Sequence, residues 1–375
     1  MVGLSSEFQF RDVFHKGNVN LLAREITRNY PGFAKAKFIK DSLHNREALG
    51  FLERSNQICA ALRSYLPDDF PHACQILIDS LGKPLTEPGK TVWDAFIIMP
   101  QTAFVARYGK DHYDLSMRAL YEMTQRFSAE GDLRTFLELD YKKTMQLLQK
   151  WAKDPSPHVR RLVSEGTRPR LPLAGRIQRF VDDPKPLVKL LELLKDDPSL
   201  YVRRSVANNF NDIAKDNPEV VVATFQKWNQ GAGKDRLWLI RHALRSLVKQ
   251  GHPGAMQILG VNTSAKAKVT GLMIEDKKVT IGENLEVSFS LQCLEREETK
   301  FIVDYQIDFV KARNKRAKKV FKLKNVTLQP KEKKEITFVF KARNTSGRKL
   351  YPGRHGLEIL VNGNVMAGSS WELLH

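Results

Sequence analysis

Several hallmarks of secreted, membrane and metal-dependent proteins are missing from this sequence. Its three cysteines, Cys59, Cys74 and Cys293, are far apart and odd in number, and no CxxC pair occurs. They suggest neither a disulfide framework nor a zinc site, and they fit a reducing compartment. No apolar run approaches the ~20 residues of a membrane span, and residues 1–14 hold acids and aromatics instead of a signal-peptide core. We therefore expect a cytosolic protein with no membrane association.

Motifs for common cofactors are also absent. The sequence contains no HExxH, no GxxxxGK[ST] and no glycine-rich dinucleotide fingerprint. We expect neither a metal nor a nucleotide cofactor.

An excess of positive charge is the main compositional feature. The 375 residues include 61 Lys+Arg and 42 Asp+Glu, for a net charge of +19 and a pI near 9.7. The excess is shared, with +9 in residues 265–375 and +10 in residues 1–264. Such a charge favours a polyanionic partner, nucleic acid first and an anionic membrane second. The plainer alternative is a soluble protein that is simply basic.

A segment of the chain nearly repeats itself. Asp154–Val163 (DPSPHVRRLV) recurs as Asp197–Val206 (DPSLYVRRSV), with an offset of 43 residues. A period of about 40–47 residues with two helices per unit is typical of HEAT-type repeats, which stack into a solenoid. Residues 140–151 and 184–194 are the expected preceding helices, and a weaker third copy lies at Leu239–Leu244.

The hydrophobic period changes from helical to two near residues 260–268. Alternating apolar residues over 285–291, 301–309 and 336–340, and the turn signal Asn362-Gly363, predict about seven short strands. We therefore predict a multidomain α-then-β protein: a HEAT-like α-helical repeat solenoid over residues 1–262, and an immunoglobulin-like antiparallel β-sandwich over 266–375. Residues 262–265 are the expected linker.

After its first copy the repeat is interrupted. Ser164–Pro172 reads SEGTRPRLP, and its glycine and two prolines would weaken or stop a helix. This stretch carries Glu165, Arg168 and Arg170. Two further carboxylates stand out beside basic residues: Glu130, at the expected end of an amphipathic helix, and Asp212, ten residues after the second Val-Arg-Arg. Any one of them is more simply a surface carboxylate or a helix-terminal ion pair.

The basic residues allow two interpretations. Arginines beside the buried valines of HEAT helices can form ladders with acids of the next repeat, or they can contact phosphate. Arg168 and Arg170 are the best phosphate candidates, since they lie in a loop without an expected ladder, and residues 311–319 are a second basic segment. The predicted DNA-binding residues are Arg161, Arg168, Arg170, Arg203, Arg204, Lys215, Arg241, Arg245, Lys315 and Arg316.

The interrupted segment, Val163–Pro172, closely resembles the signature of AlkC, a bacterial family of alkylpurine DNA glycosylases in the HEAT-like repeat superfamily. The resemblance covers about residues 7–260. Further matches lie at Pro31–Phe33, Leu66–Pro71, Thr124–Glu130, Ser205–Asn209 with Asp212, and Leu239–Leu244. Some members carry a C-terminal immunoglobulin-like domain, which would correspond to residues 266–375.

The resemblance implies hydrolysis of the N-glycosidic bond of cationic bases such as 3-methyladenine and 3-methylcytosine, in duplex DNA held in a concave groove. It implies no requirement for a snug base pocket, and carboxylates that approach the deoxyribose. Glu165, Glu130 and Asp212 match the acidic positions, with Glu165 the main one, and Arg168 matches a groove arginine. Leu173 stands where many relatives have a lesion-contacting Trp, and Gly131-Asp132 replaces more apolar residues.

We therefore expect a bacterial, cytoplasmic and monomeric DNA repair enzyme that acts without a metal. The alternative is a non-enzymatic HEAT-repeat module that binds DNA or a protein. A weaker third interpretation assigns protein or carbohydrate binding to the sandwich, although its charge of +9 favours DNA.

Overall fold

A computed structural model describes residues 9–88, 93–345 and 347–375. The chain divides into two compact units, Met1–Asn217 and Pro218–His375. Within the described ranges, no helix is both long and apolar enough to cross a membrane. All three cysteines are buried and form no disulfide.

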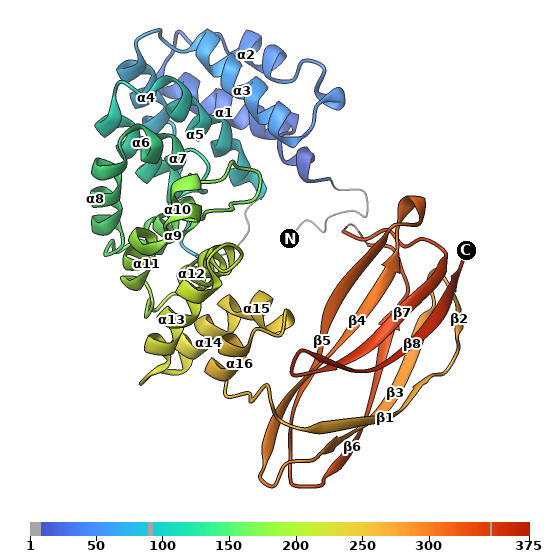
Figure 1. The fold of residues 1–375 in the computed structure, drawn as a ribbon. Helices are drawn as coiled ribbons and strands as arrows, with labels where there is room; N and C mark the ends of the chain where they lie inside the picture. The colour runs from blue at the N-terminus through green and yellow to red at the C-terminus, as the bar shows by residue number, and fades with distance from the viewer. Residues whose placement is uncertain (1–8, 89–92, 346) are drawn as a thin grey trace. The chain divides into compact units, whose positions relative to one another are not determined.

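The first unit is an array of short helices (Figure 1). Their bounds are η1 (Phe10–Val13), α1 (Lys16–Asn29), α2 (Lys35–Ser42), η2 (Arg46–Ala48), α3 (Phe51–Tyr65), α4 (Phe70–Asp79), η3 (Trp93–Ile98), α5 (Met99–Tyr108), α6 (Tyr113–Thr124), α7 (Leu133–Leu139), α8 (Tyr141–Trp151), α9 (Pro157–Gly166), α10 (Gln178–Asp182), α11 (Lys185–Glu192) and α12 (Leu200–Ile213). Local signals start several of them. Asp140, for example, accepts a hydrogen bond from the backbone N–H of Lys143 at 2.9 Å, which satisfies a free donor at the start of α8.

The predicted repeat is a pair of similar helical hairpins. The two copies form α9 and α12, which pack against each other, and α8 and α11 precede them as expected. Val159 and Val202, the valines before the two arginine pairs, are 0% exposed. The valines that recur in the repeat are therefore the residues buried where α9 packs on α12.

The second unit begins with four helices and continues as a β-sandwich (Figure 1). The helices are α13 (Pro218–Asn229), α14 (Lys234–Ala243), α15 (Arg245–Lys249) and α16 (Pro253–Ile258). The remaining elements are β1 (Ala267–Ile274), β2 (Lys278–Thr280), β3 (Asn284–Cys293), β4 (Thr299–Val310), η4 (Ala312–Asn314), β5 (Arg316–Leu328), β6 (Lys333–Lys341), β7 (Gly353–Val361) and β8 (Asn364–Leu374).

The strands form two sheets, of order β1-β3-β6 and β2-β8-β7-β4-β5. Alternate residues of both sheets fill a shared core, which includes Leu285, Phe301 and the fully buried Trp371. Asn362 and Gly363 both have positive φ and turn β7 into β8, as the Asn-Gly signal predicts. The sandwich differs from the prediction in one pairing, because the short β2 runs parallel to β8.

The last helices are joined closely to the sandwich within the second unit. Met256 of α16 packs with Val261 and Ile302 of β4. A Cβ placed on Gly363 would lie 2.5 Å from the Cα of Gly251, so the two backbones touch at glycines. The last helix ends at Ile258 and the first strand begins at Ala267, and the predicted linker lies between them. The two compact units, however, meet after Asn217. The domain boundary at residues 262–266 stays a prediction.

Candidate active site

The interrupted segment positions the candidate carboxylate. α9 ends at Gly166, whereas α12, its partner in the repeat, runs on to Ile213. A Cβ on Gly166 would lie 2.5 Å from a methyl carbon of Leu133, so glycine lets the end of α9 approach α7 closely. Glu165 is thus held on the last turn of a short, tightly packed helix.

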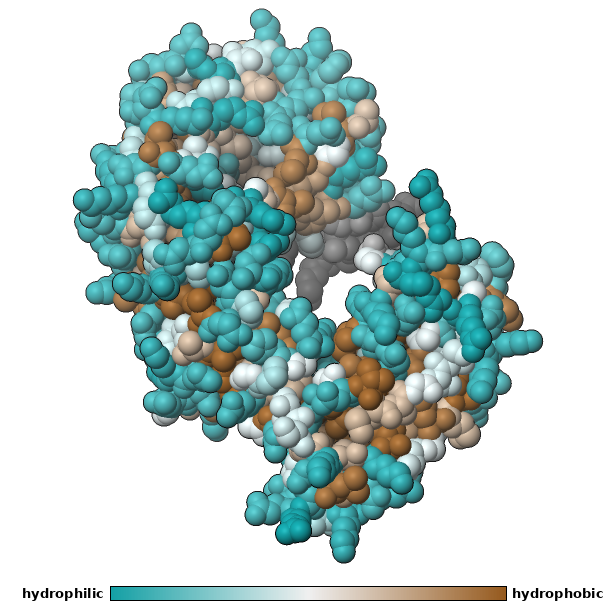
Figure 2. Space-filling model, in the orientation of Figure 1, coloured by the Kyte–Doolittle hydropathy of each residue, from teal (hydrophilic) through white to brown (hydrophobic). Residues whose placement is uncertain are grey.

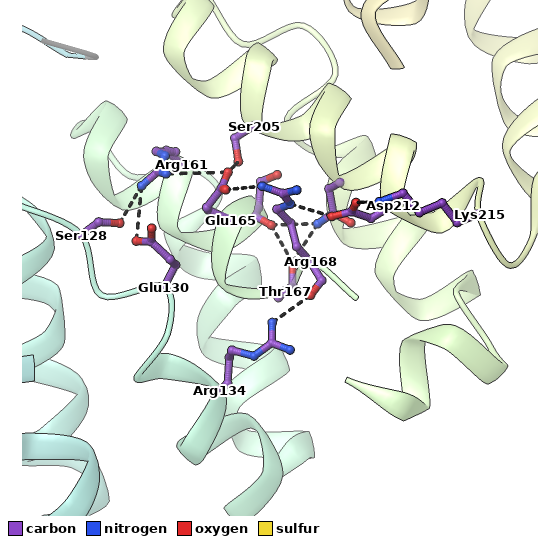
Figure 3. A network of polar contacts seen from close by, with 12 residues as sticks. Ser128, Glu130, Arg134, Arg161, Glu165, Thr167, Arg168, Ser205, Asp212 and Lys215 are labelled. Carbon is purple, nitrogen blue, oxygen red and sulfur yellow. Dashed lines mark hydrogen bonds and ion pairs between the residues drawn. The ribbon is translucent and has the colours of Figure 1, made fainter. Parts of the chain in front are cut away.

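Glu165 is almost fully enclosed by polar partners (Figure 3). Its side chain is 8% exposed. Its Oε1 accepts a hydrogen bond from Arg168 Nη1 at 2.6 Å, and its Oε2 accepts one from Ser205 Oγ at 2.6 Å. Arg161 Nη2 lies 3.8 Å from the same Oε2. The carboxylate is therefore fixed in place before any ligand binds.

These partners keep Glu165 ionised. Burial raises the pKa of its carboxyl group, but the charges of Arg161 and Arg168 and the hydrogen bonds from Ser205 and Arg168 outweigh burial, so the pKa is lowered overall. The site therefore contains a carboxylate, not a carboxylic acid, at neutral pH.

Glu130 approaches the same cluster from another element. We predicted it at the end of a helix; α6 instead ends at Thr124, and Glu130 lies in the loop before α7. Arg161 Nη1 donates to Ser128 Oγ at 2.6 Å and lies 3.5 Å from Glu130 Oε2. The Glu130 side chain is 27% exposed, so it is the least restrained of the three predicted acids.

Asp212 joins the cluster through Arg168. Its Oδ2 accepts from Arg168 Nε at 2.8 Å and its Oδ1 from Lys215 Nζ at 2.8 Å (Figure 3), and its side chain is 3% exposed. Arg168 thus bridges Asp212 and Glu165. The structure brings all three predicted carboxylates into one continuous polar network.

The loop arginines are paired, contrary to our expectation that they join no ladder. Besides the bridge made by Arg168, Arg170 Nε donates to Asp216 Oδ2 at 2.7 Å. Both partner acids lie one repeat later in the sequence. The stacking of repeats therefore supplies acids to the loop as well as to the helices.

The two members of each arginine pair have different surroundings. Arg160 binds Asp197 with Nε at 2.6 Å, and it also donates to the backbone carbonyls of Asp154 and Pro155. Arg203, its counterpart 43 residues later, is 6% exposed and donates to the equivalent carbonyls of Asp197 and Pro198. Its burial favours a structural role over the phosphate contact that we predicted.

The second arginine of each pair faces outward or into the site. Arg161 lies in the carboxylate network, and its guanidinium is 5.1 Å from the ring centre of Tyr201. Arg204 is exposed. Positions 161 and 204 are therefore the members of the pairs that remain available to a ligand.

The other predicted DNA-binding residues stay predictions, and all of them except Lys215 lie outside the carboxylate network. Lys215 belongs to the first unit, and its side chain is 46% exposed. In the second unit, Arg241 and Lys315 are exposed, and Arg245 is half-buried at the start of α15. Arg316 begins β5 and pairs with Asp308 at 2.9 Å.

Leu173, the predicted lesion contact, has an unusual backbone. Its φ is +62° and 69% of its surface is exposed. A left-handed conformation costs a non-glycine residue roughly 1–2 kcal/mol. Leu173 lies between two cavities, of 420 and 590 Å³, and lines both of them. Strain maintained at such a position favours a functional role for this residue.

The smaller cavity adjoins the carboxylate network. Glu130, Glu165, Arg161 and Ser128 lie in its lining together with Tyr201. Phenylalanine rings and other apolar side chains form much of the remaining wall. Figure 2 shows apolar residues gathered on part of the surface of the helical unit, within a largely hydrophilic exterior.

Sequence reasoning missed several members of this site. Ser128, Tyr201, Ser205 and Asp132 hold or line the carboxylate cluster. Tyr201 and Ser205 flank the second arginine pair, so the 43-residue offset could have indicated that they lie beside the site. Ser128 lies in the matched stretch Thr124–Glu130 and Asp132 in the substituted pair Gly131-Asp132, but neither residue was assigned a role, because their loop has no counterpart in the repeat. Among the described residues, no cluster of three or more His, Cys, Asp or Glu side chains could hold a metal.

Asp132 is a third carboxyl group in the wall of the cavity, beside Glu130 and Glu165. Burial, opposed by a hydrogen bond with Thr102 and reinforced by the charge of Glu130, raises its pKa to about 6. A raised carboxyl pKa means that stability is lost as pH rises from about 4 to about 6. Asp132→Asn should therefore raise the melting temperature more at pH 8 than at pH 4.5.

A matched variant provides the control for that measurement. Asp114 lies on α6 with 85% of its side chain exposed, so Asp114→Asn should leave the melting temperature nearly unchanged at both pH values. An equal effect of Asp132→Asn at pH 4.5 and pH 8 would contradict the assigned ionisation.

Three comparisons relate the chain to known proteins. The model of a family described as uncharacterised protein YhaZ, C-terminal Ig-like domain, matches residues 268–375. The uncharacterized protein YhaZ of Bacillus subtilis (strain 168) is 34% identical over 356 residues, which span 95% of this chain and 96% of YhaZ. The structure of Pseudomonas fluorescens alkylpurine DNA glycosylase AlkC, bound to DNA containing an abasic site analog, is 35% identical. It aligns with a TM-score of 0.90 over 98% of this chain and 100% of AlkC.

Proposed function

Because this chain belongs to the family of AlkC and YhaZ, we propose that it is a DNA glycosylase that removes alkylated bases during base excision repair. Its substrates are cationic lesions in duplex DNA, 3-methyladenine and 3-methylcytosine in the first place. It acts as a monomer in the bacterial cytoplasm, and it hydrolyses only the N-glycosidic bond.

The observation that carries this proposal is the ionised, immobilised Glu165 at the edge of a cavity. A base alkylated at N3 leaves as a neutral molecule, so no acid is needed to protonate it. The enzyme must still stabilise the positive charge that develops on the sugar in the transition state, and a fixed carboxylate does so. At 4 Å and an effective dielectric of 20 this attraction is about 4 kcal/mol, or roughly a thousandfold in rate.

We assign a different task to Glu130. Its side chain is more exposed than those of Glu165 and Asp212, and its ion pair with Arg161 is long, at 3.5 Å. It is therefore the acid best able to move toward a water molecule and orient it for attack. Asp212, held by Arg168 and Lys215, keeps Arg168 in position against Glu165.

The test is release of free base from duplex DNA containing 3-methyladenine or 3-methylcytosine. We expect release in the presence of EDTA, since a cationic leaving group needs no Lewis acid, and no release of unmodified adenine. Tight DNA binding without release would instead support the non-enzymatic HEAT-repeat alternative. Dependence of release on an added divalent metal would contradict the metal-independent mechanism.

The two arginines of the second repeat provide a test of DNA binding. Arg204 is exposed, so Arg204→Ala should weaken binding to undamaged duplex and reduce the slope of log K against log salt by about 0.9. Arg203 donates to buried carbonyls, so Arg203→Ala should lower stability by about 1–3 kcal/mol. At a temperature where it remains folded, it should leave that slope unchanged.

Binding isotherms at four or more salt concentrations, with circular dichroism melts, measure both effects. The assignment of Arg204 to phosphate contact fails if both variants show the wild-type slope. A reduced slope for Arg203→Ala alone would reverse the assignment within the pair.

A further inference from the structure

A single loop contributes to the walls of both cavities. Residues 167–177, which we call the site loop, connect α9 to α10. The site loop carries Arg168, which bridges two of the site carboxylates, and Leu173, which lines both cavities. It forms neither helix nor strand, so side chains of neighbouring elements have to satisfy its backbone groups and hold its shape.

Arg134 of α7 reaches both ends of the site loop. Its Nη1 donates to the backbone carbonyl of Arg168 at 2.8 Å (Figure 3), and its Nη2 donates to the backbone carbonyl of Gly175. One planar guanidinium therefore ties together two points of the loop that enclose Leu173. Both bonds go to the backbone, so Arg134 holds the course of the chain itself.

The surroundings of Arg134 make these two bonds necessary. The residue is 7% exposed. Burial lowers the pKa of its guanidinium, the charge of Glu138 opposes this effect, and the charge of Arg168 adds to it. A buried charged group is tolerated only when its donors are hydrogen-bonded. The loop carbonyls meet that need, so the loop conformation and the buried charge stabilise each other.

The contact made by Arg134 extends to the candidate catalytic carboxylate through one residue. Arg168 accepts from Arg134 with its backbone carbonyl, and its guanidinium donates to Glu165 and to Asp212. A shift of the site loop would therefore move that guanidinium relative to Glu165. The second bond of Arg134, to the far end of the loop, restrains the segment in which Leu173 keeps a φ of +62°.

We propose that Arg134 is a positioning residue of the glycosylase, which clamps the site loop from α7. The clamp sets Arg168 against Glu165, and it keeps Leu173 between the two cavities. The proposal rests on the glycosylase function above. It adds to that function a residue that acts through the loop and not by contact with the reacting atoms.

Hydrogen exchange and single-turnover base release measure the clamp and its effect on the reaction separately. Arg134→Met keeps an apolar stem and removes both donors, so the amides of residues 168–177 should exchange about tenfold faster. Release of 3-methyladenine should slow about ten- to a hundredfold, since a displacement of about 1 Å is enough for such a loss. Affinity for undamaged duplex and its salt slope should stay at wild-type values, because Arg134 is buried.

The conservative variant Arg134→Lys should recover part of both effects. An ammonium group can donate to the loop carbonyls, but it lacks the fixed fork that holds two of them at once. Its rate of base release and its loop exchange should therefore lie between those of the wild type and Arg134→Met.

Arg54 provides the matched control. It is 1% exposed, and its guanidinium also donates to backbone carbonyls, those of Arg11, Arg46 and Leu49. None of these carbonyls belongs to the site loop. Arg54→Met should therefore lose stability, as Arg134→Met does, but retain wild-type base release and wild-type exchange of the site loop. Both variants are compared at a temperature where they remain folded.

The outcomes separate the clamp from the glycosylase function. Wild-type exchange of the site loop in Arg134→Met would overturn the clamp. Undiminished base release by that variant, or equal slowing by Arg134→Met and Arg54→Met, would overturn the positioning role and leave the glycosylase function intact. A wild type that released no base would contradict the glycosylase function, whereas faster exchange confined to the site loop in Arg134→Met would still support the clamp.

Discussion

Glu165→Gln should lower the rate of 3-methyladenine release by about a thousandfold while DNA affinity is retained. The amide keeps the size of the side chain and can still bond Ser205, but it cannot stabilise positive charge on the sugar. The loss corresponds to the roughly 4 kcal/mol expected for a carboxylate about 4 Å from that charge. DNA affinity should survive because the substitution removes no phosphate contact. Single-turnover release and a binding isotherm measure the two quantities separately.

A matched substitution tests whether the position, and not the loss of any carboxylate, matters. Glu192 is a half-exposed acid at the end of α11 that pairs with Lys195 at 3.1 Å. Glu192→Gln should release base at the wild-type rate, since exposed ion pairs contribute little. A Glu165→Gln enzyme that retained wild-type rates would refute the assignment of Glu165 as the catalytic carboxylate.

Arg168→Met should produce the largest loss of stability, about 3–5 kcal/mol near pH 7. Arg168 is the partner shared by Glu165 and Asp212, whose side chains are 8% and 3% exposed. Methionine fills similar space but leaves two buried carboxylates short of a cation, and breaking a buried pair from one side is costly. Because the protein has two compact units, the transition should be followed with more than one probe.

The pH dependence of that loss follows from the sign of the Glu165 shift. In the wild type its pKa is lowered, so its ion pairs stabilise the fold above the unfolded pKa, and this stability is lost as pH falls through the folded pKa. Without Arg168 the effect of burial has less opposition and the pKa of Glu165 rises. The deficit of Arg168→Met should therefore shrink as pH falls from 7 toward 4.

Arg170→Met provides the comparison. Its pair with Asp216 is more exposed, at 24% and 21%, so its loss should cost much less stability than the loss of Arg168. Equal destabilisation by the two substitutions would contradict the bridging role of Arg168.

Most of the helices and strands could be predicted from the sequence, because the spacing of apolar residues indicates helix or strand locally and tertiary packing did not change these elements. The 43-residue offset placed α9 and α12, and the change to period two placed β3, β4 and β6. The turn at Asn362-Gly363 was predictable because such a turn requires positive φ, which Asn and Gly adopt readily. The parallel pairing of β2 with β8 was not predictable in this way, because three residues carry too little pattern.

The end of α6 was misplaced for a different reason. Neither proline nor glycine lies between Thr124 and Glu130, so nothing local marks the stop. Instead the segment after the helix makes tertiary contacts: the backbone carbonyl of Gln125 accepts from the N–H of Leu85 at 2.9 Å, and Arg126 donates to the backbone carbonyl of Gly82. Glu130 consequently reaches the site from a loop.

The roles of the arginines were only partly readable. Arg203 and Arg204 are chemically identical neighbours, yet one is buried and the other exposed. Their positions around the helix do not separate a structural from a phosphate-binding role, because both arginines lie beside the buried valines of α12. The acids that pair with Arg168 and Arg170 lie 44 and 46 residues later, close to the repeat length, so the repeat itself held that information.

The glycine contact between the turn after α15 and the β7–β8 turn bears on how the last helices are connected to the sandwich. Gly251 and Gly363 touch backbone to backbone and Met256 packs on Ile302, so the sandwich and the last helices before it share one packed interface inside the second unit. Four of the predicted phosphate-binding cations, Arg241, Arg245, Lys315 and Arg316, therefore belong to the same compact unit, two on each side of the helix-to-strand transition.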